Sequence, residues 1–250
     1  MSIIRITVEY DGTDYVGWAR QPNGPSVQAA LEKALAIVAQ APVLALASGR
    51  TDAGVHAAGQ VVSFAPPCER PLKAWHIGVN SELPRDIAVV KAEHAPDGFD
   101  ARRSASGKRY RYQIWNGPTR SPLHARTAWE IFRPLNVEAM ARAAREFLGE
   151  HDFAAFRAEG CDARTTVRTM RRVDVTGISG GGIAIEVEAT AFLRHMVRAM
   201  VGTLVDIGHG KRANDIARVL ASRDRGQAGP TAPPHGLCLM EVYYNRSVGP

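Results

Sequence analysis

One short stretch of the chain combines charged residues and glycines in a pattern that could do chemistry. Residues 49–57 read GRTDAGVHA, so Arg50 and Asp52 stand two residues apart between two glycines. Glycine permits backbone angles that other residues resist, and it lets a substrate approach closely. A carboxylate beside a cation is held in its charged form. An ionised Asp52, aimed by Arg50, could therefore act as a nucleophile.

The neighbouring segments predict that this stretch is a loop between two strands. Residues 43–47 before it are apolar, and residues 60–64 after it alternate between polar and apolar. Functional side chains are often presented on such connections by a rigid scaffold. The alternative is a surface turn with a solvated ion pair, which is the commoner case for an isolated pair of this kind.

The composition of the whole chain limits the possible classes of protein. Its 250 residues are 45% hydrophobic and 22% charged, which suits one large domain or two small ones with a proper core. The formal net charge of +6 favours a polyanionic partner, nucleic acid first. Cys68, Cys161 and Cys238 are widely spaced and predict free, mostly buried thiols in a reducing compartment. With no leader or membrane-spanning pattern, we expect a cytoplasmic protein.

Hydrophobic periodicity predicts strands and helices that alternate in both halves of the chain. The predicted strands cover residues 3–8, 43–47, 60–64, 87–92, 108–112, 172–178 and 183–189, and a final strand runs through Tyr244. The predicted helices cover residues 27–40, 72–79, 137–148 and 213–222, and Met196, Met200, Val201 and Leu204 lie at helical spacing. Ser26 and Asn136 are typical capping residues for two of these helices. This order predicts two similar α+β lobes around a cleft, a catalytic lobe at 1–117 and a second lobe at 118–250.

The segment KRYRY at residues 108–112 could bind an RNA base. In a strand, Tyr110 and Tyr112 would share one face with Lys108, and Arg109 and Arg111 would share the other. Aromatic rings interleaved with arginines suit an unstacked base and its phosphates. The alternative is an edge strand with a solvated basic face.

Two further groups of arginines are candidates for function. Residues 161–172 contain Arg164, Arg168, Arg171 and Arg172. Such a cluster could neutralise phosphates, although a solvated run of charge is equally compatible with the sequence. Arg198 lies on an otherwise apolar predicted helix, where a charge needs a partner.

Taken together, these segments resemble the TruA-type family of tRNA pseudouridine synthases. GRTDAGVHA resembles the active-site loop of that family, and YDG…GW.RQ at residues 10–21 resembles its opening pattern, with Ala19 where a glutamine is usual. Further matches are DAR…KRYRY at 100–112, HDFAAF at 151–156, FLRHMVRAMVG at 192–202 and AxxxGLxL at 232–239. The resemblance extends from Tyr10 to about Tyr243.

The resemblance implies two ferredoxin-like lobes with joined antiparallel sheets, a basic cleft and a homodimer. It implies the conversion of uridine to pseudouridine in the anticodon arm of tRNA, at tRNA positions 38, 39 and 40, with no metal or organic cofactor. Asp52 would be the nucleophile, and Arg50 and Arg198 would keep it ionised and oriented. Tyr110 would pack against the target base. Attack on the base at C6, attack on the sugar at C1′ and assistance of a glycal route all stay open.

Two rival interpretations remain at this point. The first is an RNA-binding module of the same fold that has lost catalysis, and the second is a metal-independent hydrolase that uses Asp52 on a small substrate. Glycosidases use two carboxylates that flank the bond to be broken. The motifs contain no second carboxylate positioned for that role, which argues against a hydrolase of the glycosidase type. For His56, we favour a structural role in the loop over that of a catalytic base.

Overall fold

The computed structural model describes residues 3–161 and 163–244, which form two compact units. The first unit runs as far as Ser106 and takes in the chain again from Leu239, and the second unit spans Gly107–Cys238. The predicted lobes differ from these units in two respects: residues 107–117, which include Tyr110, belong to the second unit, and the chain from Leu239 onward belongs to the first. The roles given to the lobes stay predictions. A tail after Tyr244, expected to be mobile, lies outside the described residues.

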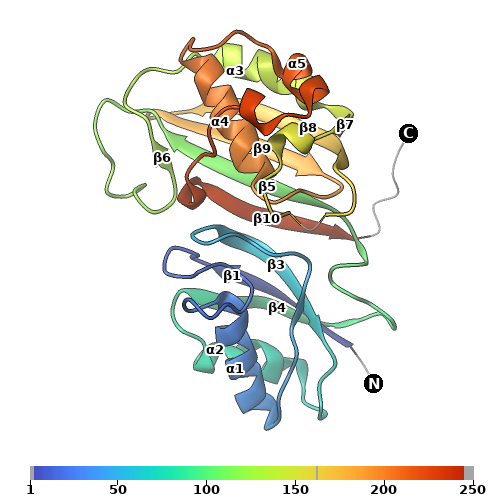
Figure 1. The fold of residues 1–250 in the computed structure, drawn as a ribbon. Helices are drawn as coiled ribbons and strands as arrows, with labels where there is room; N and C mark the ends of the chain where they lie inside the picture. Colours follow the sequence, from blue (N-terminus) through green and yellow to red (C-terminus); the bar gives the residue numbers. More distant parts are fainter. Residues whose placement is uncertain (1–2, 162, 245–250) are drawn as a thin grey trace. The chain divides into compact units, whose positions relative to one another are not determined.

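The first unit is a sheet with helices on it (Figure 1). Its strands are β1 (Ile3–Tyr10), β2 (Leu46–Ala47), β3 (His56–Phe64), β4 (Ile87–Ala95) and, from Leu239 onward, β10 (Leu237–Tyr244). Its helices are α1 (Val27–Ala39) and α2 (Val79–Glu82), with the π-helical turn Ala74–Gly78 leading into α2. The strand order is β4-β1-β3-β10, and the short β2 also pairs with β3. Strand β1 is antiparallel to both β3 and β4.

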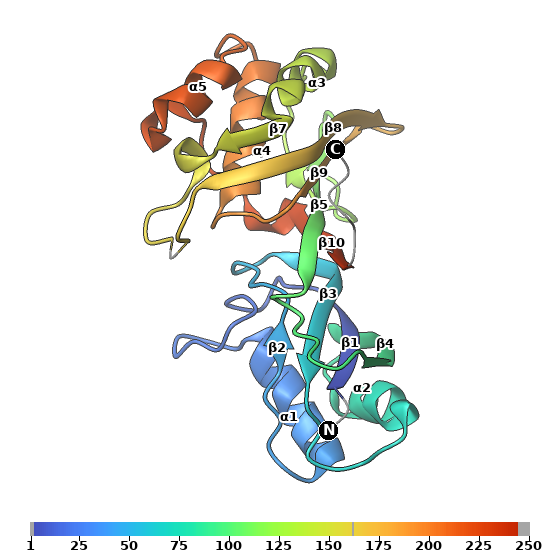
Figure 2. The same cartoon turned by 90° about the vertical axis from the view of Figure 1, so that its right-hand side faces the viewer.

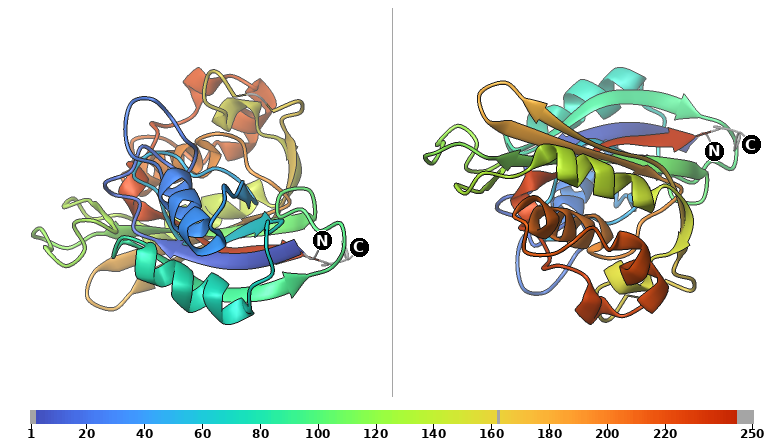
Figure 3. Two further views of the ribbon diagram at one scale, coloured as in Figure 1. Left: turned by 90° about the horizontal axis from the view of Figure 1, so that it is seen from below. Right: turned by 90° about the horizontal axis from the view of Figure 1, so that it is seen from above.

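Alternation in β1 explains how this unit forms its core. Ile4, Ile6 and Val8 are buried on one face, whereas the residues between them are partly exposed. Figure 3 (left) shows α1 and α2 in front of the strands of this unit. Ser26 begins α1 as predicted, because its hydroxyl accepts the N–H of Ala29 at 3.3 Å.

The second unit has the same ferredoxin-like order of strand, helix, hairpin and helix. Its strands are β5 (Ala105–Trp115, from Gly107 onward), β6 (Trp129–Glu130), β7 (Gly149–Asp152), β8 (Val167–Ile178) and β9 (Gly182–Ala189). Its helices are α3 (Val137–Ala144), α4 (Met196–Gly208) and α5 (Ile216–Ser222). The sheet order is β5-β9-β8-β7, with antiparallel neighbours. Figures 1 and 2 both show α3, α4 and α5 gathered beside the strands of this unit.

The α+β prediction is therefore confirmed, and several predicted elements change length for identifiable reasons. The predicted strand 43–47 shrinks to β2, because the N–H of Ala45 donates to the Glu32 carboxylate at 3.0 Å instead of to a strand. Helix α4 begins at Met196, the first of the residues predicted at helical spacing, because His195 before it adopts the left-handed conformation with φ 61°. Strand β3 begins at His56, so His56 belongs to the strand and not to the loop.

Two expectations about the whole chain can be compared with the structure. Cys68, Cys161 and Cys238 are half-buried, less than expected, and none of them forms a disulfide. Within the two described ranges, no helix is long and apolar enough to cross a membrane.

The turn before β5 depends on one carboxylate. Asp100 accepts the backbone N–H groups of Arg102 and Arg103 on its Oδ1, both at 2.8 Å. These backbone bonds, that of Arg103 above all, hold the pKa of Asp100 below its usual value. Because the folded pKa is the lower one, this contribution to stability is present above the unfolded pKa and is lost as the pH falls through the folded pKa.

We expect Asp100→Ala to lower the free energy of unfolding by about 1 kcal/mol at pH 7, since two charge-assisted bonds to a partly solvated carboxylate disappear. The difference from wild type should shrink as the pH falls below about 4. Urea titrations at several pH values check this, with the exposed Asp97→Ala as the control. A difference that stays constant down to pH 3 would contradict the role given to the carboxylate.

Candidate active site

The predicted catalytic loop lies in the first unit, between β2 and β3. Asp52 is half-buried and Arg50 is exposed, and Thr51 between them is buried. The loop closes as a turn in which the N–H of Val55 donates to the carbonyl of Asp52 at 3.2 Å. Asp52 is therefore presented from a short turn with the neighbouring residue fixed in the interior.

The segment that follows β1 lies directly against this loop. A Cβ added to Gly12 would lie 2.1 Å from the Val55 carbonyl oxygen, and one added to Gly17 would lie 2.7 Å from that of Thr51. Gly17 also has φ +110°, which side chains rarely adopt. The N–H of Trp18 donates to the Thr51 carbonyl at 3.1 Å. Glycine is thus required at positions 12 and 17 of the opening motif, because the backbone there packs directly against the backbone of the loop.

Buried polar side chains hold the other side of the loop. Gln60 on β3 accepts the Ser48 hydroxyl at 2.7 Å and donates to the Gly49 carbonyl at 3.0 Å. His56 is buried, and its Nδ1 accepts the N–H of Gly12 at 3.1 Å. This contact agrees with the structural role favoured for His56.

Tyr110 lies in the second unit, on the face of β5 predicted from the alternation. Tyr110 and Tyr112 are buried, whereas Arg109 and Arg111 lie on the opposite face. The Tyr110 ring packs edge-on against Phe192, with centroids 5.0 Å apart and an interplanar angle of 84°. Sequence reasoning did not single out Phe192, although the FLRHMVRAMVG segment begins with it.

Arg198 on α4 is held by the C-terminal motif. Its Nε donates to the Ala232 carbonyl at 2.7 Å, and the N–H of Ala232 donates to the Arg198 carbonyl at 3.1 Å. The Tyr112 hydroxyl donates to the next carbonyl, that of Pro233, at 2.8 Å. Burial raises the pKa of Tyr112, and the positive charge of Arg198 opposes this rise. The AxxxGLxL motif thus fixes the arginine that sequence reasoning selected.

The structure places Arg50 and Asp52 in the first unit and Tyr110 and Arg198 in the second. Within the first unit, Arg50 and Asp52 lie two residues apart in the connection between β2 and β3, and Asp52 begins the turn closed by Val55. Within the second, burial and the charge of Arg198 act on Tyr112, the neighbour of Tyr110 on the same face of β5. The catalytic roles of the four residues stay predictions.

Several arginines considered for RNA binding are already engaged. Arg109 and Arg111 both bond to Glu186 on the neighbouring strand β9, at 3.2 Å and 2.5 Å. Arg172 pairs with Asp174 on its own strand at 2.5 Å. The positive charge of this face, which was predicted to contact phosphates or water, is therefore partly neutralised by the carboxylates of Glu186 and Asp174.

The other arginines differ in how accessible their side chains are to RNA. Arg168 donates to the Thr165 carbonyl at 2.9 Å, and burial lowers the pKa of its guanidinium. Arg102, Arg103 and Arg164 are exposed. These exposed arginines are the better candidates for phosphate contacts, because a bound phosphate would not have to displace a carboxylate.

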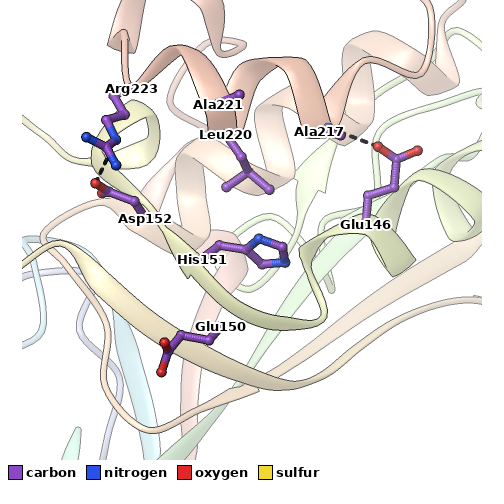
Figure 4. Close-up of a pocket in the computed structure, with 8 residues that line it drawn as sticks. All are labelled: Glu146, Glu150, His151, Asp152, Ala217, Leu220, Ala221 and Arg223. Carbon is purple, nitrogen blue, oxygen red and sulfur yellow. Dashed lines mark hydrogen bonds and ion pairs between the residues drawn. The ribbon is translucent and has the colours of Figure 1, made fainter.

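A separate hollow of about 470 Å³ opens in the second unit (Figure 4), and its lining includes His151 and Asp152 of the HDFAAF segment but neither Tyr110 nor Arg198. Glu146, Asp152 and Arg223, three of its charged residues, have structural partners. Glu146 accepts the N–H of Ala217 at 2.9 Å near the start of α5, and Asp152 pairs with Arg223 at 3.0 Å. The described part of the chain contains no cluster of three or more His, Cys, Asp or Glu residues able to hold a metal ion.

Comparison with known proteins gives the same family over nearly the whole chain. The sequence profile described as tRNA pseudouridine synthase matches residues 6–102 and 143–245. The chain is 54% identical over 245 residues to tRNA pseudouridine synthase A of Myxococcus xanthus, covering 98% of this chain and 92% of the relative. It is 52% identical to that of Syntrophotalea carbinolica and 49% identical to that of Geobacter sulfurreducens, covering 98% of this chain in both cases and 97% and 100% of the relatives.

The loop, the lobes and these relatives together define a class of RNA-modifying isomerase. The chain belongs to the tRNA pseudouridine synthase family. It is accordingly an isomerase that converts uridine in tRNA to pseudouridine.

The close approach at Gly12 gives a direct test of how the loop is held. We expect Gly12→Ala to lower the free energy of unfolding by about 2 kcal/mol, since a methyl group there must displace backbone. Gly177→Ala is the matched control, because nothing lies within 4 Å of its added Cβ. Urea titrations of both variants measure their free energies of unfolding. Equal values would contradict the close packing of Gly12 against the loop.

Proposed function

We propose that this protein isomerises uridines in the anticodon arm of tRNA and that Asp52 is the nucleophile. The observation that carries the proposal is the presentation of Asp52. It is half-buried at a turn backed by Gly12 and Gly17, and it is the only carboxylate of the loop. A nucleophile must be held in one orientation relative to the bond that it attacks, and this loop provides that rigidity.

The reaction is an isomerisation in which no electrons are gained or lost overall. The bond between uracil N1 and C1′ of the ribose breaks, the base turns, and a bond forms between uracil C5 and C1′. The hydrogen on C5 leaves as a proton, and N1 gains one. Asp52 attacks either C6 of the base or C1′ of the sugar, and in both cases it leaves again when the product forms. Under this proposal no metal or organic cofactor takes part.

The other predicted residues are assigned supporting roles. Arg50 and Arg198 keep the Asp52 carboxylate ionised and aimed. Arg50 is exposed, and an exposed ion pair stabilises by only about 1 kcal/mol or less. Tyr110 packs on the target uracil, and its own ring is held by Phe192. The assignment of these residues to one reaction rests on the sequence motifs.

Binding must supply the energy that releases the target base from its stack. Flipping a nucleotide costs a few kcal/mol, so the protein needs contacts elsewhere on the RNA. The exposed Arg102 and Arg103, on the turn closed by Asp100, are candidates for phosphate contacts in the first unit. We further propose that the protein forms a homodimer and that it lies in the cytoplasm. The family resemblance supports the dimer, and the free thiols support the cytoplasm.

Tritium release from tRNA labelled at uridine C5 tests the reaction and its nucleophile. We expect wild type to release tritium and Asp52→Asn to release none, with the affinity for tRNA within about twofold, because one carboxylate adds little to binding. Asp97→Asn serves as an exposed carboxylate control. Release by Asp52→Asn would refute the nucleophile. Binding without release would indicate an RNA-binding module, and free uracil would indicate a hydrolase.

Salt dependence of binding tests the assignment of the exposed arginines. The double variant Arg102→Ala, Arg103→Ala should lower the slope of log affinity against log salt concentration by about 2, one for each lost phosphate contact. Arg172→Ala should change the slope much less, because its guanidinium is paired with Asp174. Equal slopes in the double variant and wild type would place the RNA contacts elsewhere.

A further inference from the structure

One buried hydrogen bond connects the candidate catalytic loop to the central strand of the first unit. Tyr10 is the last residue of β1 and is only 3% exposed. Its phenol hydroxyl and the hydroxyl of Thr51 share a hydrogen bond of 2.8 Å. Thr51 stands directly between Arg50 and Asp52, so this bond is formed in the middle of the loop.

The position of the Tyr10 hydroxyl is restricted by the pairing of its backbone and the packing of its ring. Its backbone is paired on both sides, with Ala57 on β3 and with Ile87 on β4. Its ring packs against the buried Trp18, with centroids 5.9 Å apart. A phenol has few rotatable bonds, so a ring packed in this way places its hydroxyl with little freedom.

Thr51 is consequently held at two points. Its carbonyl accepts the N–H of Trp18 at 3.1 Å, and its side-chain hydroxyl is bonded to Tyr10. A β-branched side chain has a restricted χ1, so fixing its hydroxyl also restrains the backbone that carries it. The peptide that follows leads directly into Asp52.

We propose that Tyr10 is a positioning residue for Asp52, acting through the hydroxyl of Thr51. The inference rests on the proposed function, because it assumes that Asp52 is the nucleophile. Tyr10 is buried and so does not touch the substrate. Its hydroxyl sets the orientation of Thr51, and thereby the direction in which the Asp52 carboxylate points. The bond thus contributes to the rate of reaction and not to the binding of tRNA.

The test compares variants that remove or keep the bond. In single-turnover tritium release with enzyme in excess, Tyr10→Phe should react about tenfold more slowly, because small misplacements of a reacting group are costly. Its Kd for tRNA should stay within about twofold. Thr51→Val, which has the same shape without the hydroxyl, should show the same loss. Thr51→Ser keeps the hydroxyl and should recover most of the rate.

The double variant Tyr10→Phe, Thr51→Val shows whether the two residues act together. If they act through one bond, the double variant is no slower than either single variant. Losses that multiply would overturn the proposal. Tyr15→Phe is the matched control, because it removes a hydroxyl bonded to Asp86 and not to the loop. Its rate should equal that of wild type.

Two further results separate this inference from its alternatives. Rates are expressed per folded molecule from urea titrations, so a Tyr10→Phe variant that loses stability but keeps its rate overturns a positioning role. Asp52→Asn is measured in the same assay. A fully active Asp52→Asn would overturn the proposed nucleophile, whereas an inactive Asp52→Asn beside a fully active Tyr10→Phe overturns only the inference about Tyr10.

Discussion

The contact between two stretches of backbone, at Gly12 and Gly17, is the constraint on which the candidate site depends. Any side chain at Gly12 would collide with the carbonyl of Val55. Because the stretch after β1 can lie this close, Trp18 and His56 reach the backbone partners that fix the loop. The loop is therefore rigid on account of its neighbours, and a short polar loop alone would not be.

In the second unit, side chains are likewise held by segments that are distant in the sequence. Arg198 is fixed through both its side chain and its backbone by Ala232, and Tyr112 is fixed by the adjoining Pro233. The loop that carries Asp52, the ring of Tyr110 and the side chain of Arg198 are thus each held by a motif far away in the sequence. This pairing explains why the motifs are spread along the whole chain, since a site residue and the segment that holds it are both constrained.

Local signals could be predicted from the sequence, whereas signals that depend on strand register could not. The caps at Ser26 and Asn136 and the two faces of β5 follow from neighbouring residues alone. The neutralisation of Arg111 could not be predicted, because it requires Glu186 to lie opposite on β9. The bond between Tyr10 and Thr51 likewise spans forty-one positions and depends on the packing of β1.

The course of the chain also has a consequence during synthesis. Strand β10 belongs to the first unit from Leu239 onward, but the whole second unit is made before it. At typical rates of translation this interval is on the order of ten seconds. During that time β3 lacks the strand that borders it at Gly59, where β10 packs so closely that no side chain fits. The sheet that carries the candidate catalytic loop is thus completed last.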